Sequence, residues 1–114
     1  EVFRFGVSGA PVVDWRYYDT IYTERYMGLL SENAVGYDAG SCLTNVSDHD
    51  IGKLLLIHGA VDDNVHVPNA FALMDRLHQE QHPFDLMIYP NAGHGLPRDG
   101  ARRMWDFLLG QCFP

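Results

Sequence analysis

The sequence is poor in basic residues and in cysteine. Eight lysines and arginines stand against fifteen aspartates and glutamates, which gives a formal net charge of -7 at pH 7. This deficit of positive charge, with no run of basic residues, argues against a nucleic-acid surface or an anchor to an anionic membrane. The two cysteines, Cys42 and Cys112, are too few for a disulfide framework. Geometry decides whether they pair, so the sequence leaves that question and the cellular compartment open.

Long apolar runs are missing as well. No stretch approaches the roughly 20 apolar residues that a membrane-spanning helix needs. Internal repeats, low-complexity tracts and flexible linkers are also absent, so we expect a single domain over residues 1–114. Residues 1–5 resemble neither a signal peptide nor an initiator segment, and we therefore expect a piece of a longer protein.

What is present is organised around residues 54–66. An apolar run over residues 54–57 leads through His58 into a turn that holds Asp62 and Asp63. This pattern is typical of a strand that is buried on both faces and delivers side chains at its carboxyl end. The two adjacent aspartates cannot share one proton as a carboxylate dyad does across a cleft. We therefore expect one of them to face a histidine and the other to be a solvated turn residue.

A second apolar run repeats the arrangement. Residues 84–89 predict a strand, and the loop after it carries His94 between two glycines. The histidine follows the acid by one predicted helix, so both should lie at the ends of neighbouring strands. An acid and a histidine placed in this way are two members of a Ser-His-Asp relay.

The remaining segments predict an alternation of strands and helices. A short buried strand is expected over residues 3–10, and a loop with at most one helical turn, near 41–46, over residues 30–50. Pro68 suits the start of a helix, and Asp99 suits the cap of a last one. The buried stripes of these two helices are predicted to be Val67, Ala70, Phe71, Met74 and Leu77, then Ala101, Met104, Trp105 and Leu108.

Residues 12–28 are rich in aromatic side chains. Trp15, Tyr18 and Tyr22 recur at helical spacing, which places them on one face. An aromatic stripe usually packs a core, but tyrosine keeps a hydroxyl group that needs a partner and so suits the wall of a pocket. Both interpretations stay open, and the second would fit a flat, apolar substrate side chain.

Two other patterns carry less weight. Residues 6–10, Gly-Val-Ser-Gly-Ala, nearly match the G-x-S-x-G elbow of hydrolases, but too few residues precede them for a strand and the continuation is a poor helix start. We interpret Ser8 as a small residue packed in a strand. His58, Asp62 and His66 are possible metal ligands by type, yet their spacing matches no closed zinc pattern. We expect no metal and no cofactor.

The order of elements and several exact motifs resemble one family. The predicted order is that of the C-terminal portion of an α/β-hydrolase, with about three parallel strands and flanking helices. More closely, nearly the whole chain resembles the dipeptidyl peptidase IV family of the prolyl oligopeptidase group. The residues that carry this resemblance are Ala10-Pro11-Val12, Trp15, Tyr17-Tyr18-Asp19, residues 22–28 (Tyr-Thr-Glu-Arg-Tyr-Met-Gly), residues 55–59, residues 62–66 (Asp-Asp-Asn-Val-His) and His94-Gly95.

The resemblance implies specific roles. Asp62 would be the acid of the triad and His94 its base, in a serine exopeptidase that releases dipeptides from peptides with a penultimate proline or alanine. The substrate pocket would be formed by Val12, Trp15, Tyr18, Tyr22, Asn64 and Val65. The resemblance also implies a homodimer of the longer protein. The nucleophilic serine, the residues that hold the oxyanion and the propeller would lie outside this chain, which should therefore be inactive alone.

The sequence departs from the family in its cysteines. Some members bridge a cysteine at the position of Phe5 to the one at Cys112, and Phe5 removes that bridge here. Two alternatives also remain. An esterase or acylaminoacyl peptidase on the same fold would have a similar acid and histidine, although residues 22–28 speak against it. A catalytically silent homologue would instead work by binding partners.

Overall fold

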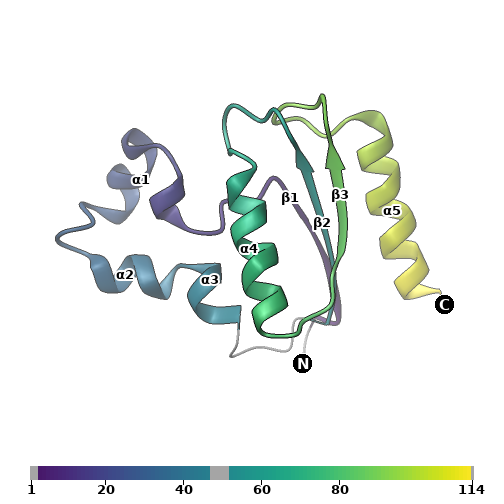
Figure 1. Cartoon of the computed structure of the whole chain (residues 1–114), viewed down its shortest axis with the longest axis horizontal. Coiled ribbons are helices and arrows are strands. Elements are labelled where there is room, and N and C mark those ends of the chain that lie inside the picture. Colours follow the sequence, from purple (N-terminus) through teal and green to yellow (C-terminus); the bar gives the residue numbers. More distant parts are fainter. Residues whose placement is uncertain (1–2, 47–51, 114) are drawn as a thin grey trace.

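The computed structural model describes residues 3–46 and 52–113. In this part of the chain, β1 (Phe5–Gly9), β2 (Lys53–Gly59) and β3 (Asp85–Tyr89) form a parallel sheet in the order β1-β2-β3 (Figure 1). The α/β prediction with three parallel strands is confirmed. All three strands therefore end at the same edge of the sheet, where their carboxyl ends place the next residues side by side.

β2 is the centre of the core. It pairs with β1 on one side and with β3 on the other, so its register aligns Ser8, Leu56 and Leu86 across the sheet. Residues 55–59 of β2 are all buried, as the continuous apolar run predicted. The strand is thus covered on both faces over these residues, and the chain reaches the surface again only in the turn that follows its carboxyl end, at Val61 and Asp63.

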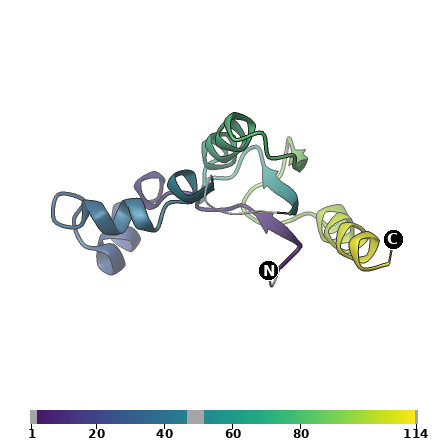
Figure 2. The ribbon, with the colours of Figure 1, turned by 90° about the horizontal axis from the view of Figure 1, so that it is seen from below.

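Helices cover the two faces unequally. α4 (Pro68–Gln79) lies on one face, where its Leu73 and Leu77 join Leu56 in the main hydrophobic cluster. α5 (Arg98–Cys112) contacts β1 and β2 from the other side (Figure 2). Because side chains alternate along β2, Leu56 and His58 share the α4 face, and Leu55 borders the hollow beside α5.

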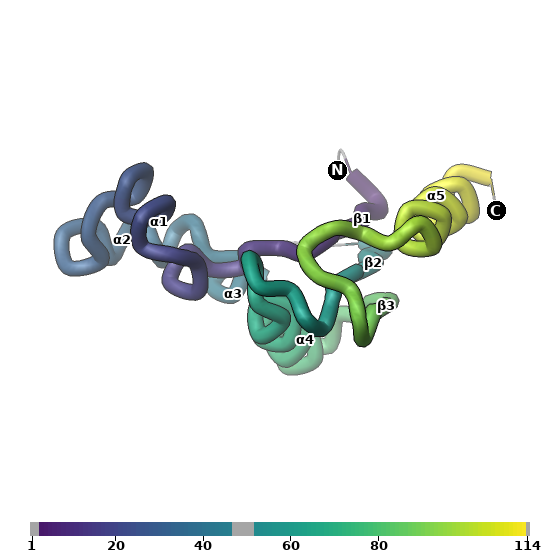
Figure 3. The backbone as a smooth tube through the Cα atoms, turned by 90° about the horizontal axis from the view of Figure 1, so that it is seen from above, coloured from purple at the N-terminus to yellow at the C-terminus, as the bar shows by residue number. Residues whose placement is uncertain are grey.

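The aromatic segment and the helices after it project to one side of the sheet. They comprise a 3-10 turn at Trp15–Tyr17, α1 (Thr20–Met27), α2 (Ala34–Ala39) and α3 (Cys42–Asn45). The described part of the molecule is accordingly elongated, with extents of 47 × 34 × 23 Å (Figure 3). Among the described residues, none of the helices has the length and apolar character needed to cross a membrane.

The aromatic stretch is not the single helix that its periodicity predicted. Asp14 caps the 3-10 turn through its side chain, and Asp19 caps α1 by accepting from the N–H of Tyr22. Tyr18, between the two elements, has an extended backbone. The two capping aspartates interrupt the helix because each satisfies orphan N–H groups of the turn that follows it.

The segment over residues 30–50 contains more helix than predicted. α3 confirms the expected turn near residues 41–46, whereas α2 was missed. Asn33 caps α2 by accepting from the N–H of Gly36, and the hydroxyl group of Tyr37 donates to the carbonyl of Gly28. These local polar bonds hold α2 without an apolar period, which is why its pattern looked like a loop.

The predicted strand at residues 3–10 and both predicted stripes need correction. β1 begins at Phe5, and its residues 5–8 are only half-buried, since β2 is its single neighbour in the described sheet. In α4, Phe71 is 50% exposed, and Leu73 and Asn69 lie inside instead. The buried face of α4 thus includes position 69, where the side-chain oxygen of Asn69 accepts from the backbone N–H of Val13.

The last helix meets the sheet with a narrower face than predicted. In α5, Ala101 and Trp105 are exposed, whereas Met104 and Leu108 are half-buried. Asp99 does not cap the helix, because it lies within the first turn of α5 and Pro97 holds the cap position. Its carboxylate accepts from the hydroxyl group of Tyr89 at 2.8 Å instead. Cys42 and Cys112 are both exposed and free, so they form no bridge with each other.

The end of β2 fits closely against the loop that follows β3. A Cβ atom added to Gly59 would overlap the backbone carbonyl oxygens of Ala92 and Gly93. The loop also bonds to β2 and its turn, through Ala60 N to Tyr89 O at 2.9 Å and Val61 N to Ala92 O at 3.2 Å. The glycine is thus required for two loops to touch.

Gly59→Ala should therefore destabilise the protein by about 1–3 kcal/mol, because the added methyl group forces backbone apart. The measurement is the free energy of unfolding in urea, followed by circular dichroism. Gly6→Ala is the matched control, since Gly6 also lies in a strand and an added Cβ would meet nothing within 4 Å. Equal stability of the two variants would contradict the close fit.

Candidate active site

An acid and a histidine meet at the carboxyl edge of the sheet. Asp62 follows β2, His94 follows β3, and Nδ1 of His94 lies 3.0 Å from Oδ2 of Asp62. The expectation that one of the two adjacent aspartates faces the histidine is confirmed: Asp62 is buried and Asp63 is exposed. The carboxylate only accepts, so Nδ1 carries the hydrogen of this bond.

Backbone groups of its own turn fix the carboxylate of Asp62. Its Oδ1 accepts from the N–H of Asn64 at 2.9 Å and from the N–H of Val65 at 3.0 Å. Burial raises the pKa of Asp62, but the hydrogen bonds from Asn64 and His94 outweigh burial and hold the pKa below its ordinary value of 3.8. The group is therefore a carboxylate at neutral pH, with one oxygen held by the turn and the other directed at His94.

His94 is the accessible member of the pair. Its side chain is 47% exposed, whereas that of Asp62 is fully buried. An imidazole whose Nδ1–H is held by a buried carboxylate has its tautomer and ring orientation fixed, and it can take a proton at Nε2. His94 lies in the loop between β3 and α5. The hydroxyl group of Tyr89, at the end of β3, donates to Asp99 in the first turn of α5, and this bond connects the two ends of the loop.

The aromatic residues predicted for the pocket form one cluster. The ring of Trp15 stacks on that of Tyr22 at 5.8 Å between centroids, and Tyr18 meets both rings edge-on. The hydroxyl group of Tyr18 donates to Oδ1 of Asn64 at 2.6 Å, which joins the cluster to the acid turn. The structure thus brings Trp15, Tyr18, Tyr22 and Asn64 together despite the broken helix.

The two valines predicted for the pocket are largely covered by other residues. Val12 is half-buried and Val65 is buried, and each comes shortly after the carboxyl end of a strand, β1 or β2. Beside Asn64 there is an open hollow of about 530 Å³, which is large enough for a small peptide fragment. Its lining residues are Arg16, Tyr17, Tyr18, Asp19, Asp63, Asn64 and His66.

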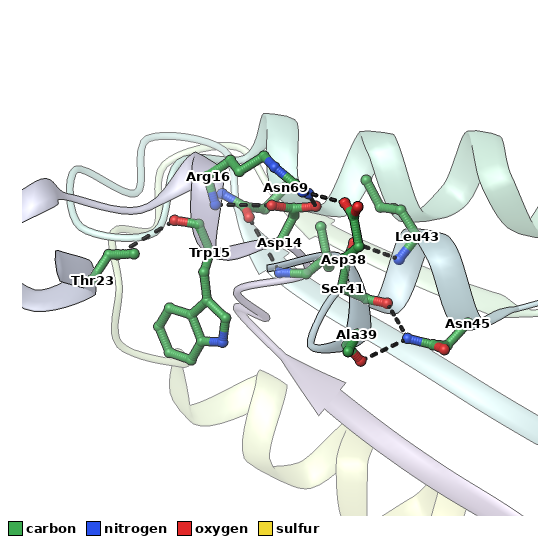
Figure 4. A network of polar contacts seen from close by, with 11 residues as sticks. Asp14, Trp15, Arg16, Thr23, Asp38, Ala39, Ser41, Leu43, Asn45 and Asn69 are labelled. Carbon is green, nitrogen blue, oxygen red and sulfur yellow. Dashed lines mark hydrogen bonds and ion pairs between the residues drawn. The ribbon is translucent and has the colours of Figure 1, made fainter. Parts of the chain in front are cut away.

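A polar network that sequence reasoning missed supports the aromatic cluster (Figure 4). The carboxylate of Asp14 accepts from the backbone N–H of Arg16 and from its guanidinium group. The same guanidinium group also forms an ion pair with Asp38. Asn69 accepts from the N–H of Val13 at 3.2 Å and donates to the carbonyl of His66 at 3.2 Å. The sequence held no usable signal for Asn69, because the predicted buried stripe of this helix does not include position 69.

The described residues offer no set of side chains that could bind a metal ion. Over residues 3–46 and 52–113, no group of three or more histidine, cysteine, aspartate or glutamate side chains is arranged to hold an ion. His66 is exposed, whereas His58 and Asp62 are buried. His58 lies 3.4 Å from Asp62, but the three residues do not form a set of ligands.

The fold and the pair define a class. A parallel sheet in which an acid follows one strand and a histidine follows the next is the C-terminal part of an α/β-hydrolase fold. Residues 1–112 match the model of the prolyl oligopeptidase family. The chain belongs to this family.

Individual relatives agree with this assignment. The chain is 44% identical, over 110 residues, to a protein of Grosmannia clavigera named "Probable dipeptidyl-aminopeptidase B", a match that covers 95% of this chain and 11% of that protein. It is 42% identical over 105 residues to dipeptidyl-aminopeptidase B of Aspergillus niger, covering 91% of this chain and 12% of the relative.

A solved structure gives the same result. The fold superposes on crystalline Porphyromonas gingivalis dipeptidyl peptidase 4 with a TM-score of 0.85 and 38% sequence identity, covering 97% of this chain and 16% of that one. The chain thus corresponds to a small part of each relative.

The depressed pKa of Asp62 predicts a pH dependence of stability. As pH falls, the unfolded chain binds the proton first, so the stabilisation is complete above pH 3.8 and is lost as pH drops through the lower folded-state pKa. The free energy of unfolding should therefore fall more steeply below about pH 4 in wild type than in Asp62→Asn. Urea unfolding at a series of pH values measures this.

Asp63→Asn provides the control for this prediction. Asp63 is the exposed neighbour in the same turn, so its variant should follow the wild-type curve. Parallel curves for wild type and Asp62→Asn would show that the pKa of Asp62 is not depressed by folding.

Proposed function

We propose that this chain is the C-terminal part of the catalytic domain of a serine exopeptidase, which releases N-terminal dipeptides with proline or alanine in the second position by acyl-enzyme chemistry. The observation that carries the proposal is the hydrogen bond between the buried carboxylate of Asp62 and Nδ1 of His94. The similarity to dipeptidyl peptidases supports the substrate class.

In this proposal, His94 and Asp62 are the base and the acid of a triad. His94 takes the proton of a serine hydroxyl through Nε2 and passes it to the leaving amine, while Asp62 stabilises the imidazolium that forms in between. The serine is supplied by a part of the protein outside this chain. Ser8 is not that residue, because it lies within β1, paired with Leu56, and not on a strand-to-helix turn.

The aromatic cluster would select the substrate side chain. A proline ring offers only apolar faces, and the rings of Trp15, Tyr18 and Tyr22 form a wall that suits it. Val12 and Val65 would narrow the slot that this wall borders. A small slot would admit proline and alanine but exclude larger side chains. The amide of Asn64, held by Tyr18, would donate to a substrate carbonyl.

Labelling by a fluorophosphonate probe tests the triad in the full-length protein that contains this chain. Wild type should be labelled, His94→Ala should lose labelling, and Asp62→Asn should be labelled at least about a hundred-fold more slowly, because the imidazole loses its correct tautomer. Asp63→Asn is the matched control and should keep the wild-type rate.

The outcomes separate the alternatives. A folded wild type that is not labelled would favour a silent homologue that binds partners. A labelled wild type that leaves glycyl-prolyl chromogenic substrates intact would favour an esterase or acylaminoacyl peptidase.

The pocket is tested by Tyr18→Phe in the same protein. This variant keeps the ring but loses the 2.6 Å hydrogen bond to Asn64, so KM for a glycyl-prolyl substrate should rise roughly three- to ten-fold. Steady-state kinetics measures the change. Tyr26→Phe is the control, since Tyr26 is exposed and does not line the hollow beside Asn64. A similar KM for both variants would remove Asn64 from the substrate contacts.

A further inference from the structure

His58 is a buried histidine that the proposed mechanism does not use. It lies next to the carboxyl end of β2, its side chain is 0% exposed, and it shares the α4 face of the strand with Leu56. Residues 54–57, directly before it in β2, are leucine and isoleucine. A titratable side chain in such a place requires an explanation.

The contacts of His58 define its tautomer. Nε2 lies 2.7 Å from the carbonyl oxygen of Val65, which is a hydrogen bond, and 3.4 Å from Oδ2 of Asp62, which is a longer electrostatic contact. A carbonyl and a carboxylate only accept, so the hydrogen is on Nε2. The imidazole therefore donates into the turn that holds the acid.

The other ring nitrogen has no such partner. Nδ1 of His58 is buried and makes no hydrogen bond to any described residue. A buried polar atom without a partner costs free energy, and an apolar side chain in this place would avoid that cost. The benefit of histidine here therefore has to come from Nε2.

We propose that His58 is a positioning residue that fixes the turn from Gly59 to Val65. Val65 is held twice: His58 binds its carbonyl oxygen, and Oδ1 of Asp62 accepts from its N–H. By bonding to Val65, the imidazole connects the end of the turn to β2. It thereby fixes the position of the Asp62 carboxylate, so that Oδ2 faces His94. This inference rests on the proposed function of Asp62 and His94.

The position of the turn bears on both halves of the proposed reaction. Asp62 orients the base, whereas Asn64 and Val65 belong to the proposed substrate contacts, and all three lie in the segment that His58 closes. Loss of the Nε2 donor should therefore lower kcat and raise KM together. A residue that only fills space would not link the two constants in this way.

The test compares His58→Leu with His58→Gln in the full-length protein. Leucine fills a similar volume without a donor, and kcat/KM should fall about ten- to a hundred-fold, with kcat lowered and KM raised. Glutamine carries an amide N–H at a reach similar to that of Nε2, and it should restore kcat/KM to within a few-fold of wild type. Leu56→Val, on the same face of β2, is the control for a weakened core and should keep both constants.

A spectroscopic measurement separates this inference from the proposed function. The Nδ1 proton that His94 shares with Asp62 should give a downfield proton resonance, assigned by its loss in His94→Ala. The resonance should be present in wild type, His58→Gln and Leu56→Val, and it should move upfield or vanish in His58→Leu. This result would support the positioning role even if the fluorophosphonate probe did not label the protein. Failure of labelling would overturn only the proposed function.

Opposite results would overturn the positioning role. They are a folded His58→Leu protein with wild-type kcat, KM and resonance, or a His58→Gln protein as impaired as His58→Leu.

Discussion

A buried negative charge is the constraint on which this structure depends. The side chain of Asp62 is fully enclosed, and an enclosed carboxylate is tolerated only where hydrogen-bond donors replace the water it has lost. The turn supplies backbone donors to one oxygen, and the histidines at positions 58 and 94 approach the other. The turn after β2 therefore follows the course that places these hydrogen-bond donors around the carboxylate.

The sheet makes this arrangement possible because parallel strands end at one edge. β2 and β3 are adjacent, so the turn after one and the loop after the other meet without a long connection. Gly59 lets them touch, and backbone bonds from residues 60 and 61 join them. The acid and the histidine are therefore held by strand register and backbone contact, and only in the last step by their own hydrogen bond.

The part of this that the sequence predicts is the part governed by local pattern. The apolar run of β2, the start of α4 at Pro68 and the pairing of an aspartate with His94 all follow from burial, period and strand order. Elements that depend on individual polar bonds or on packing, and not on an apolar period, were predicted incorrectly. The aromatic stretch divides at Asp19, α2 is held by polar bonds without an apolar period, and α5 turns Trp105 to the surface.

The site shows the same division. Residue type and spacing indicate the adjacent pair Asp62 and Asp63 and the aromatic residues, since these carry recognisable chemical groups at a strand end or at helical spacing, whereas the choice of Asp62 came from the family resemblance. They do not identify the inward amide of Asn69 or the partner of His58, because both depend on which backbone atom lies opposite in space. Three-dimensional proximity, which no single-chain pattern encodes, decides these contacts.

The bond between Tyr18 and Asn64 has a thermodynamic consequence. Asn64 is separated from Asp62 by one residue, and its N–H is one of the donors to the carboxylate. A molecule that displaced the tyrosine hydroxyl from Asn64 would act on the turn that stabilises the charge. Because linkage is reciprocal, the protonation state of Asp62 would in turn alter how tightly that molecule is held.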